Sequence, residues 1–201
     1  MYTLFVSEKR ILSLKNTKQE GVNPRMPVND VISVILNRKG VKKYKSDPVP
    51  MDLLETIVTA GTAAPNAFNR QAWLFTVVTD KEILKEIDTQ TNLRLHECPS
   101  YHALYGAPAL IILSSAKDNI YARQDCSAAN QNMALAAKSL GIASRFLDVP
   151  NLYLQSKEGK LCRERCGIPE NYQTVCFLCL GYSDEPDSKP TPKRTDVVYY
   201  I

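Results

Sequence analysis

The sequence predicts a single α+β domain in which helices flank a sheet. Amphipathic helical patterns and short strand patterns alternate along the chain, without the regular strand–helix repeat that builds a parallel sheet. Two uninterrupted apolar runs of strand length, 108–114 and 174–180, are typical of central strands covered on both faces. A length of 201 residues suits one domain with a substantial core.

The first elements follow from helical periodicity. Residues 1–26 show little of it, and we interpret them as an irregular extension of a domain that spans 27–201. From residue 27 to about residue 38, apolar residues recur at helical spacing, and Asn29 is placed to cap that helix. A second helix has its apolar face on residues 53–60.

The later elements alternate between the two periodicities. In chain order, we expect a strand at 73–78, a surface helix at 81–90, an irregular stretch at 91–105, the buried strand at 108–114, an alanine-rich helix at 125–140, a short strand or turn at 142–147, a helix at 152–166, the buried strand at 174–180 and an extended, proline-containing arm from about residue 184. The small side chains of the alanine-rich helix allow a neighbouring helix or a second subunit to approach closely.

Composition excludes several classes of protein. The net charge of +4 is spread along the chain, whereas nucleic-acid binders usually concentrate basic residues on one face. No apolar run is long enough to act as a signal peptide or to cross a bilayer. We therefore expect a cytoplasmic protein that binds neither nucleic acid nor membrane, with its six cysteines reduced.

Common catalytic motifs are absent, and we predict no metal site. The sequence contains no dinucleotide-binding glycine motif, P-loop or nucleophile elbow. His96 and His102 are six residues apart and lack the spacing of a helical zinc site. The four late cysteines superficially resemble a thiolate cluster, but residues three apart on a strand point to opposite faces, which favours core cysteines.

Side-chain amides gather in the loop between the second helix and the first strand. Asn66, Asn69 and Gln71 each offer both a hydrogen-bond donor and an acceptor, which suits the edge of a heterocyclic ligand. The alternative is that these amides bond to the backbone of their own loop, the commoner arrangement. Local evidence alone favours the alternative.

A basic cluster over 38–45 follows the first helix. It suits a phosphate clamp, in which Arg supplies a bidentate fork and Lys a point charge. It equally suits a solvated turn that interacts with the negative end of the helix dipole. The cluster by itself does not distinguish the two.

The order of these segments resembles the nitroreductase family of flavin enzymes. The matching segments are RKGVKKY at 38–44, APNAFNRQAW at 64–73, GAPALIILS at 106–114, DCSAANQNMALAAKSLGI at 125–142, CLGY at 179–182 and PKR at 192–194. No single segment is long, so the resemblance depends on their order and spacing, and it covers roughly residue 27 to the end.

This resemblance implies a three-layer sandwich with a mixed, mainly antiparallel sheet, assembled as a homodimer with FMN at the interface. It also implies a ping-pong reaction in which NADH or NADPH reduces the flavin and a small molecule, such as a nitroaromatic or a quinone, then takes two electrons. The flavin would carry the chemistry, which agrees with the lack of a catalytic motif.

Carried over residue by residue, the resemblance assigns the FMN phosphate to Arg38 and Arg194, with Lys193 beside them. The neighbouring Lys39 and Gly40 would complete the upstream half of this clamp.

The resemblance places the rest of the flavin on three short stretches. Lys42 and Asn69 would contact the ribityl chain and the pyrimidine, and Gln71 the dimethylbenzene or ribityl region. Backbone N–H groups around Asp148 and Val149 would face flavin N5 and O4.

Three positions depart from the family pattern. Gly40 replaces the usual Ser, Asn66 replaces the Ser that follows Pro65, and Ala72 replaces a proline. These departures leave open an FMN-binding store, sensor or interaction partner with little turnover. A specialised flavin reductase, such as a dehalogenase, is a further alternative within flavin chemistry.

Overall fold

A computed structural model describes residues 29–96, 98, 100–186, 193–194 and 196–201. Its helices are α1 (Asp30–Asn37), α2 (Met51–Thr62), the 3-10 turn η1 (Ala67–Asn69), α3 (Lys81–Leu95), α4 (Ala122–Ser139), α5 (Asn151–Leu154) and α6 (Lys160–Arg165). Its strands are β1 (Trp73–Val78), β2 (Ala109–Ala116), β3 (Ala143–Leu147) and β4 (Tyr172–Gly181). The expected extension at 1–26 lies outside the described residues.

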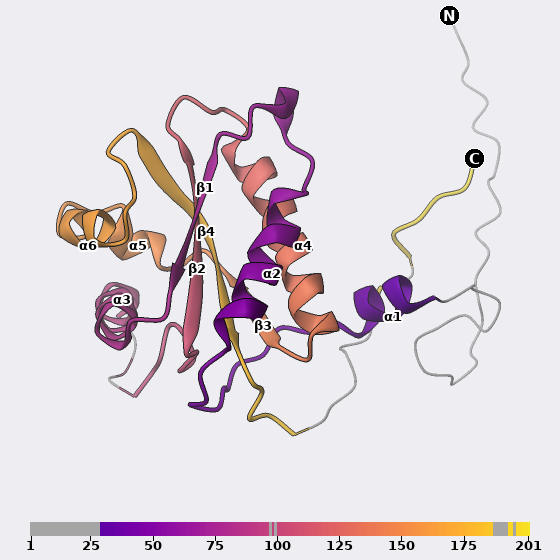
Figure 1. Ribbon diagram of the computed structural model, residues 1–201, viewed down its shortest axis with the longest axis horizontal. Coiled ribbons are helices and arrows are strands. Elements are labelled where there is room, and N and C mark those ends of the chain that lie inside the picture. Colours follow the sequence, from indigo (N-terminus) through magenta and orange to yellow (C-terminus); the bar gives the residue numbers. More distant parts are fainter. Residues whose placement is uncertain (1–28, 97, 99, 187–192, 195) are drawn as a thin grey trace, which may run out of the picture. The chain divides into compact units, whose positions relative to one another are not determined.

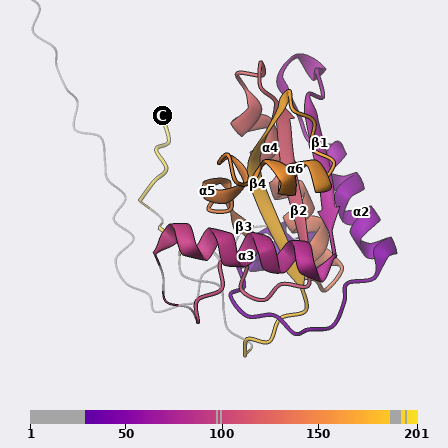
Figure 2. The ribbon, with the colours of Figure 1, turned by 90° about the vertical axis from the view of Figure 1, so that its left-hand side faces the viewer.

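The four strands form one antiparallel sheet in the order β1-β2-β4-β3. Helices α2 and α4 cover one face, and α3, α5 and α6 cover the other (Figures 1 and 2). The predicted α+β sandwich is confirmed. A parallel bridge between Gly40 and Ser144 adds a short backbone contact beside β3.

Both faces of the central strands are buried, as their apolar runs predicted. In β2, Leu110 and Ile112 join the core beneath α3, whereas Ile111 belongs to the core beneath α4. In β4, Cys179 and Cys176 lie in these two opposite cores, as expected for strand residues three apart.

The alanine-rich helix α4 packs closely against α2. A Cβ atom added at Gly61 would lie 2.1 Å from Met133 Cε, and the Asn132 amide donates to the carbonyl oxygen of Ala60 at 3.2 Å. The small residues of α4 therefore accept a neighbouring helix, which was one of the two partners expected for them.

Two helix predictions were wrong in their extent. Helix α3 continues to Leu95, through residues expected to be irregular, because Thr91 and Asn92 are buried and Asn92 donates to the carbonyl oxygen of Cys98 at 3.1 Å. The helix expected at 152–166 is instead α5 and α6. The chain bends between them because Gly159 lies directly against the backbone of Tyr153.

The close approach at Gly159 leaves no room for a side chain. A Cβ atom there would lie 2.2 Å from the Tyr153 carbonyl oxygen and 2.9 Å from Leu154 Cα, and neither backbone atom can move independently. We expect Gly159→Ala to lower the free energy of unfolding by about 1–3 kcal/mol, measured by urea denaturation. Gly40→Ala is the control, since a Cβ there meets nothing nearer than 3.4 Å. Equal stabilities for the two variants would contradict this packing.

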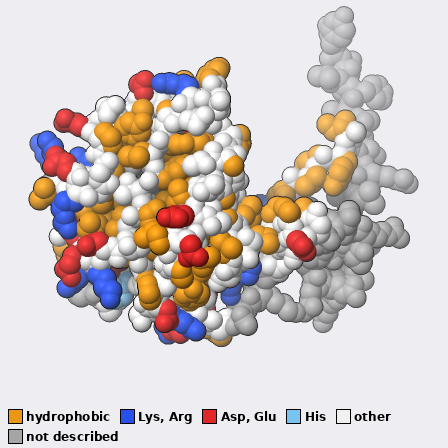
Figure 3. All heavy atoms as spheres, in the orientation of Figure 1, with side chains coloured by type: hydrophobic (Ala, Val, Ile, Leu, Met, Phe, Trp, Pro, Cys, Tyr) orange, Lys and Arg blue, Asp and Glu red, His pale blue; other side chains and the backbone are white. Residues whose placement is uncertain are grey.

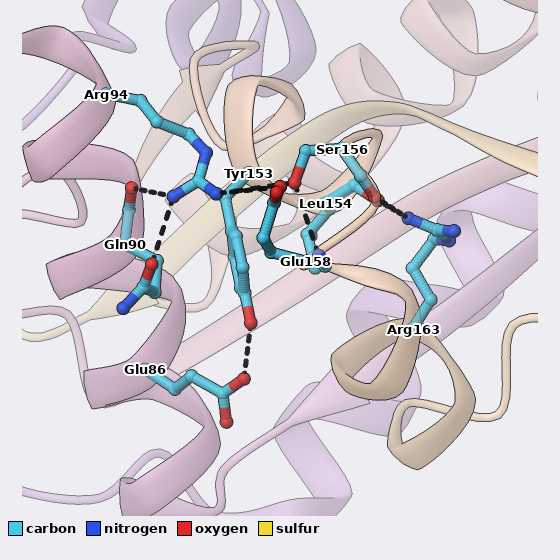
Figure 4. Close-up of polar contacts among 9 residues, drawn as sticks. Glu86, Gln90, Arg94, Tyr153, Leu154, Ser156, Glu158 and Arg163 are labelled. Carbon is cyan, nitrogen blue, oxygen red and sulfur yellow. Dashed lines mark hydrogen bonds and ion pairs between the residues drawn. The ribbon is translucent and has the colours of Figure 1, made fainter.

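Helices α3 and α5 are joined by a polar network (Figure 4). The Tyr153 hydroxyl donates to Glu86 at 2.5 Å, and Arg165 of α6 donates to the other Glu86 oxygen at 2.6 Å. The Arg94 guanidinium lies 5.0 Å from the centre of the Tyr153 ring and pairs with Glu158 at 3.2 Å. The Tyr153 hydroxyl, and to a smaller extent Arg165, hold the pKa of Glu86 below its ordinary value.

This network predicts part of the acid sensitivity of the fold. Because the pKa of Glu86 is lower in the folded chain, its stabilisation is present above the unfolded pKa and is lost as pH falls through the folded pKa. Glu86→Gln should lower the melting temperature at pH 7 and flatten its decline below about pH 4.5. Glu55→Gln, on an exposed position of α2, is the control. A decline in the Glu86 variant as steep as in the parent would refute this role.

Candidate functional site

The basic segment after α1 lies against the sheet at the start of β3. The N–H of Val41 donates to the Ser144 carbonyl oxygen at 3.2 Å, and the N–H of Lys45 donates to that of Tyr182 at 2.9 Å. The predicted clamp residues Arg38, Lys39, Gly40 and Lys42 are therefore brought together beside this strand.

Charge in this segment is only partly neutralised. Lys43 pairs with Asp184 at 2.6 Å, and the Lys42 backbone N–H donates to Glu185 at 2.5 Å. Within the part of the chain that the structure describes, the side chains of Arg38 and Lys42 form no ion pair. Their positive charge is therefore available to an anion.

Arg145 of β3 adds a cation that the sequence did not indicate. Its guanidinium lies 4.6 Å from the centre of the Tyr105 ring, and its buried Nε has no hydrogen-bond partner among the described residues. A Cβ atom at Gly40 would lie 3.4 Å from its Nη1. The guanidinium therefore places a further cation beside the backbone of Gly40, where it could contact a phosphate group.

Asp148 and Val149 follow β3 at its opposite end. They line a pocket of about 540 Å³ between β3, α5 and the first turns of α4, together with Arg123 and the half-exposed Phe146. The four residue steps from Ser144 to Asp148 span roughly 13 Å of strand. The edge of β3 therefore separates a cationic end from a pocket with a large apolar side chain.

The amide loop between α2 and β1 is held in an unusual conformation. Phe68, Asn69 and Gln71 all have positive φ angles, of 55°, 50° and 49°, which L residues rarely adopt. Asn66 Oδ1 accepts the backbone N–H of Gln71 at 2.8 Å, so the expected bond from this amide to its own loop is present.

The other two amides of the loop bond to each other rather than to the backbone. Asn69 Oδ1 accepts from Gln71 Nε2 at 3.3 Å, and both side chains are exposed. Their remaining polar atoms face outward and are accessible to a ligand. Pro65 precedes them and is also exposed.

Asp125 fixes this loop to α4, a role that the sequence did not reveal. Its Oδ1 accepts the Ala67 N–H at 2.9 Å, and its Oδ2 accepts from the Asn119 amide at 3.0 Å. Asn119 also donates to Ser115 Oγ, which in turn donates to the carbonyl oxygen of Ala72. Asp125 and Asn119 are buried, so this closed set of bonds is protected from water.

The predicted site residues form two groups within one chain. The clamp and the Asp148 pocket share the edge of β3. The loop with Pro65, Asn66, Asn69 and Gln71 is tied to the first turn of α4, which also borders that pocket. Lys193 and Arg194 belong to a separate unit, in which Arg194 pairs with Asp196 at 2.8 Å.

The described residues contain no group of three or more His, Cys, Asp or Glu side chains that could hold a metal ion. His102 instead pairs with Asp88 at 2.9 Å, and His96 is the residue that ends α3. Over the same ranges, no helix is both long and apolar enough to cross a membrane.

Comparison with known proteins gives consistent matches over the folded domain. Residues 35–182 match the model of the nitroreductase family. A protein of Archaeoglobus fulgidus, provisionally named NADH dehydrogenase/NAD(P)H nitroreductase, is 33% identical over 165 residues, which are 80% of this chain and 90% of that protein.

Two solved structures share the fold. A nitroreductase from Bacteroides fragilis with bound FMN is 27% identical, with a TM-score of 0.80. One from Desulfitobacterium hafniense, also with bound FMN, is 28% identical, with a TM-score of 0.81. Each comparison covers 87% of this chain and 100% of the other.

Proposed function

The chain belongs to the nitroreductase family, and from that premise we propose that it transfers two electrons from NADH or NADPH, through FMN, to a small planar acceptor such as a nitroaromatic or a quinone. When bound, FMN supplies the redox chemistry by accepting a hydride from the nicotinamide and passing two electrons to the second substrate. The protein binds and orients the reactants.

The edge of β3 carries this proposal. Arg38, with Lys39 and the backbone of Gly40, would hold the phosphate, and Arg145 would add a further donor. Lys42 would contact the ribityl chain. At the other end of the strand, the backbone N–H groups of Asp148 and Val149 would orient the ring beside the pocket. An anion at one end and a flat ring at the other is the shape of FMN.

A second copy of the chain would complete the site. Asn69 and Gln71 bond to each other, and their exposed amides are available to a flavin held by a partner. Large apolar side chains near the loop and the pocket are also exposed, among them Phe68 at 83% and Ile120 at 82%. Figure 3 shows hydrophobic side chains spread over one view of the molecule. We propose a homodimer, with Lys193 and Arg194 joining the phosphate clamp.

The loss of a hydroxyl at Gly40 is the main observation in favour of an FMN-binding protein with little turnover. Arg145 lies next to this glycine and offers guanidinium donors in place of the missing hydroxyl. This neighbour supports FMN binding, which both functions require, so turnover itself has to be tested.

The test is to load the purified full chain with FMN, remove free flavin and titrate it anaerobically with NADH or NADPH. We expect a yellow protein that bleaches with at least one donor and recovers its colour when a quinone is added. Free FMN at the same concentration controls for direct reduction. A yellow protein that bleaches with neither donor would refute the oxidoreductase, and a chain that retains no flavin would refute the site.

A further inference from the structure

Two of the six cysteines, Cys162 and Cys166, form a pair at the end of α6. They are one helical turn apart, and the N–H of Cys166 donates to the carbonyl oxygen of Cys162 at 2.9 Å, so the two side chains share one face of the helix end. The other buried cysteines bond elsewhere: Cys126 to the Ser114 carbonyl oxygen, Cys176 to the Asn130 amide and Cys179 to the Leu104 carbonyl oxygen. The proposed flavin chemistry uses none of these thiols.

Solvent reaches this pair from one side. Cys166 lines a surface pocket of about 190 Å³ together with Arg165 and the residues at the end of β1. The exposed fraction of Cys166 is 6%. Cys162 is fully buried and does not line the pocket. A small molecule entering from solvent therefore meets Cys166 first.

The surroundings of the two thiols shift their pKa values in opposite directions. The hydrogen bond from Cys162 lowers the pKa of Cys166, and Arg165 acts in the same direction, whereas the same bond and burial raise the pKa of Cys162. Burial raises the pKa of Cys126, Cys176 and Cys179. Among the buried thiols, Cys166 therefore has the greatest thiolate character, which is the nucleophilic form.

We propose that Cys166 and Cys162 form an oxidisable dithiol that a hydroperoxide converts into a reversible disulfide within α6. The Cys166 sulfur attacks the peroxide, the O–O bond breaks, an alcohol or water leaves, and Cys166 becomes a sulfenic acid. Cys162 then attacks that sulfur, the S–O bond breaks, and the oxygen leaves as water with the proton of the Cys162 thiol. Two thiols and one hydroperoxide give one disulfide, one alcohol or water and one further water.

The end of α6 can accommodate this bond with a small movement. Cβ atoms four residues apart on a helix lie about 5–6 Å from each other, whereas a disulfide needs about 3.5–4.5 Å. Helix α6 has only six residues, Cys166 is already its C-cap, and Gly167 follows at a φ of 68°. Closing the bond would pull on the hydrogen bond from Thr76 Oγ1 to the Cys166 carbonyl oxygen, so we expect the disulfide to be readily reduced.

The experiment treats the full chain carrying Cys98→Ser with stepwise additions of hydrogen peroxide, followed by alkylation and tryptic mapping without reductant. Arg163 and Arg165 lie between the two cysteines, so trypsin separates them unless a disulfide joins their peptides. We expect a linked pair lighter by two hydrogens, restored to thiols by dithiothreitol, while Cys126, Cys176 and Cys179 are alkylated. Alkylation of both Cys162 and Cys166, at peroxide levels that oxidise Cys98 in the parent chain, would overturn the proposal.

Single variants test the order of the two steps. In Cys162→Ser, Cys166 should stop at the sulfenic acid and be trapped by dimedone. In Cys166→Ser, Cys162 should remain a thiol under the same treatment. Oxidation of Cys162 at an unchanged rate in the second variant would overturn the assignment of Cys166 as the attacking residue. Circular dichroism checks the fold of both, and the mapping of the Cys98→Ser chain remains decisive if either variant unfolds.

Discussion

Replacement of Asp125 with alanine is expected to lower the free energy of unfolding by about 2–4 kcal/mol, because one buried and one partly buried donor lose this acceptor. The Ala67 N–H and the Asn119 amide both donate to this carboxylate, and Asp125 itself is 5% exposed. Urea denaturation measures the change. We also expect the amide loop to become more sensitive to proteases, since the bond between Asp125 and Ala67 ties it to α4.

Asp118→Ala is the matched control for this prediction. Asp118 pairs with Arg70 of the same loop at 3.2 Å, but its side chain is 74% exposed, so its loss should change the free energy of unfolding by less than about 1 kcal/mol. Asp125→Asn keeps the shape of the side chain but replaces one accepting oxygen with an amide nitrogen, which would face a donor. This variant therefore separates the effect of shape from the effect of hydrogen bonding. If Asp125→Ala were no more destabilising than Asp118→Ala, the loop would not depend on this carboxylate.

Arg38→Ala is expected to weaken FMN binding by about ten- to a hundredfold, which corresponds to the loss of one or two charge-assisted hydrogen bonds to a phosphate. The change should have little effect on folding, since Arg38 follows the last residue of α1 and its backbone N–H keeps its bond to Val34. Titration of the apoprotein, followed by flavin fluorescence, measures the affinity.

Riboflavin sharpens this experiment because it is FMN without the phosphate. Arg38→Ala should weaken FMN binding and leave riboflavin binding unchanged. Lys157→Ala removes one exposed positive charge between α5 and α6 and should affect neither ligand. An equal loss of affinity for both flavins would indicate a general distortion of the pocket, and no loss for either would remove Arg38 from the clamp.

Strand prediction succeeded where burial on both faces dominates the choice of residues. In β2 and β4, every other side chain faces the same core, so both faces require apolar residues and the run becomes continuous. Helix limits were less predictable. The helix expected at 152–166 is interrupted at Gly159, which packs against the backbone of Tyr153. Hydrophobic periodicity does not reveal a backbone contact of this kind. The polar Thr91 and Asn92 continue α3 because the fold buries them.

The sandwich, the family and the residue types of the candidate site could be predicted from the sequence, because periodicity and the order of short motifs are local properties of the chain. The groups that support the candidate site were found only in the folded structure. Asp125 meets Ala67 across 58 residues, and Arg145 reaches the clamp through the bridge between Gly40 and Ser144. Such pairings depend on how α4 and β3 pack against distant segments, so they become visible only after the chain has folded.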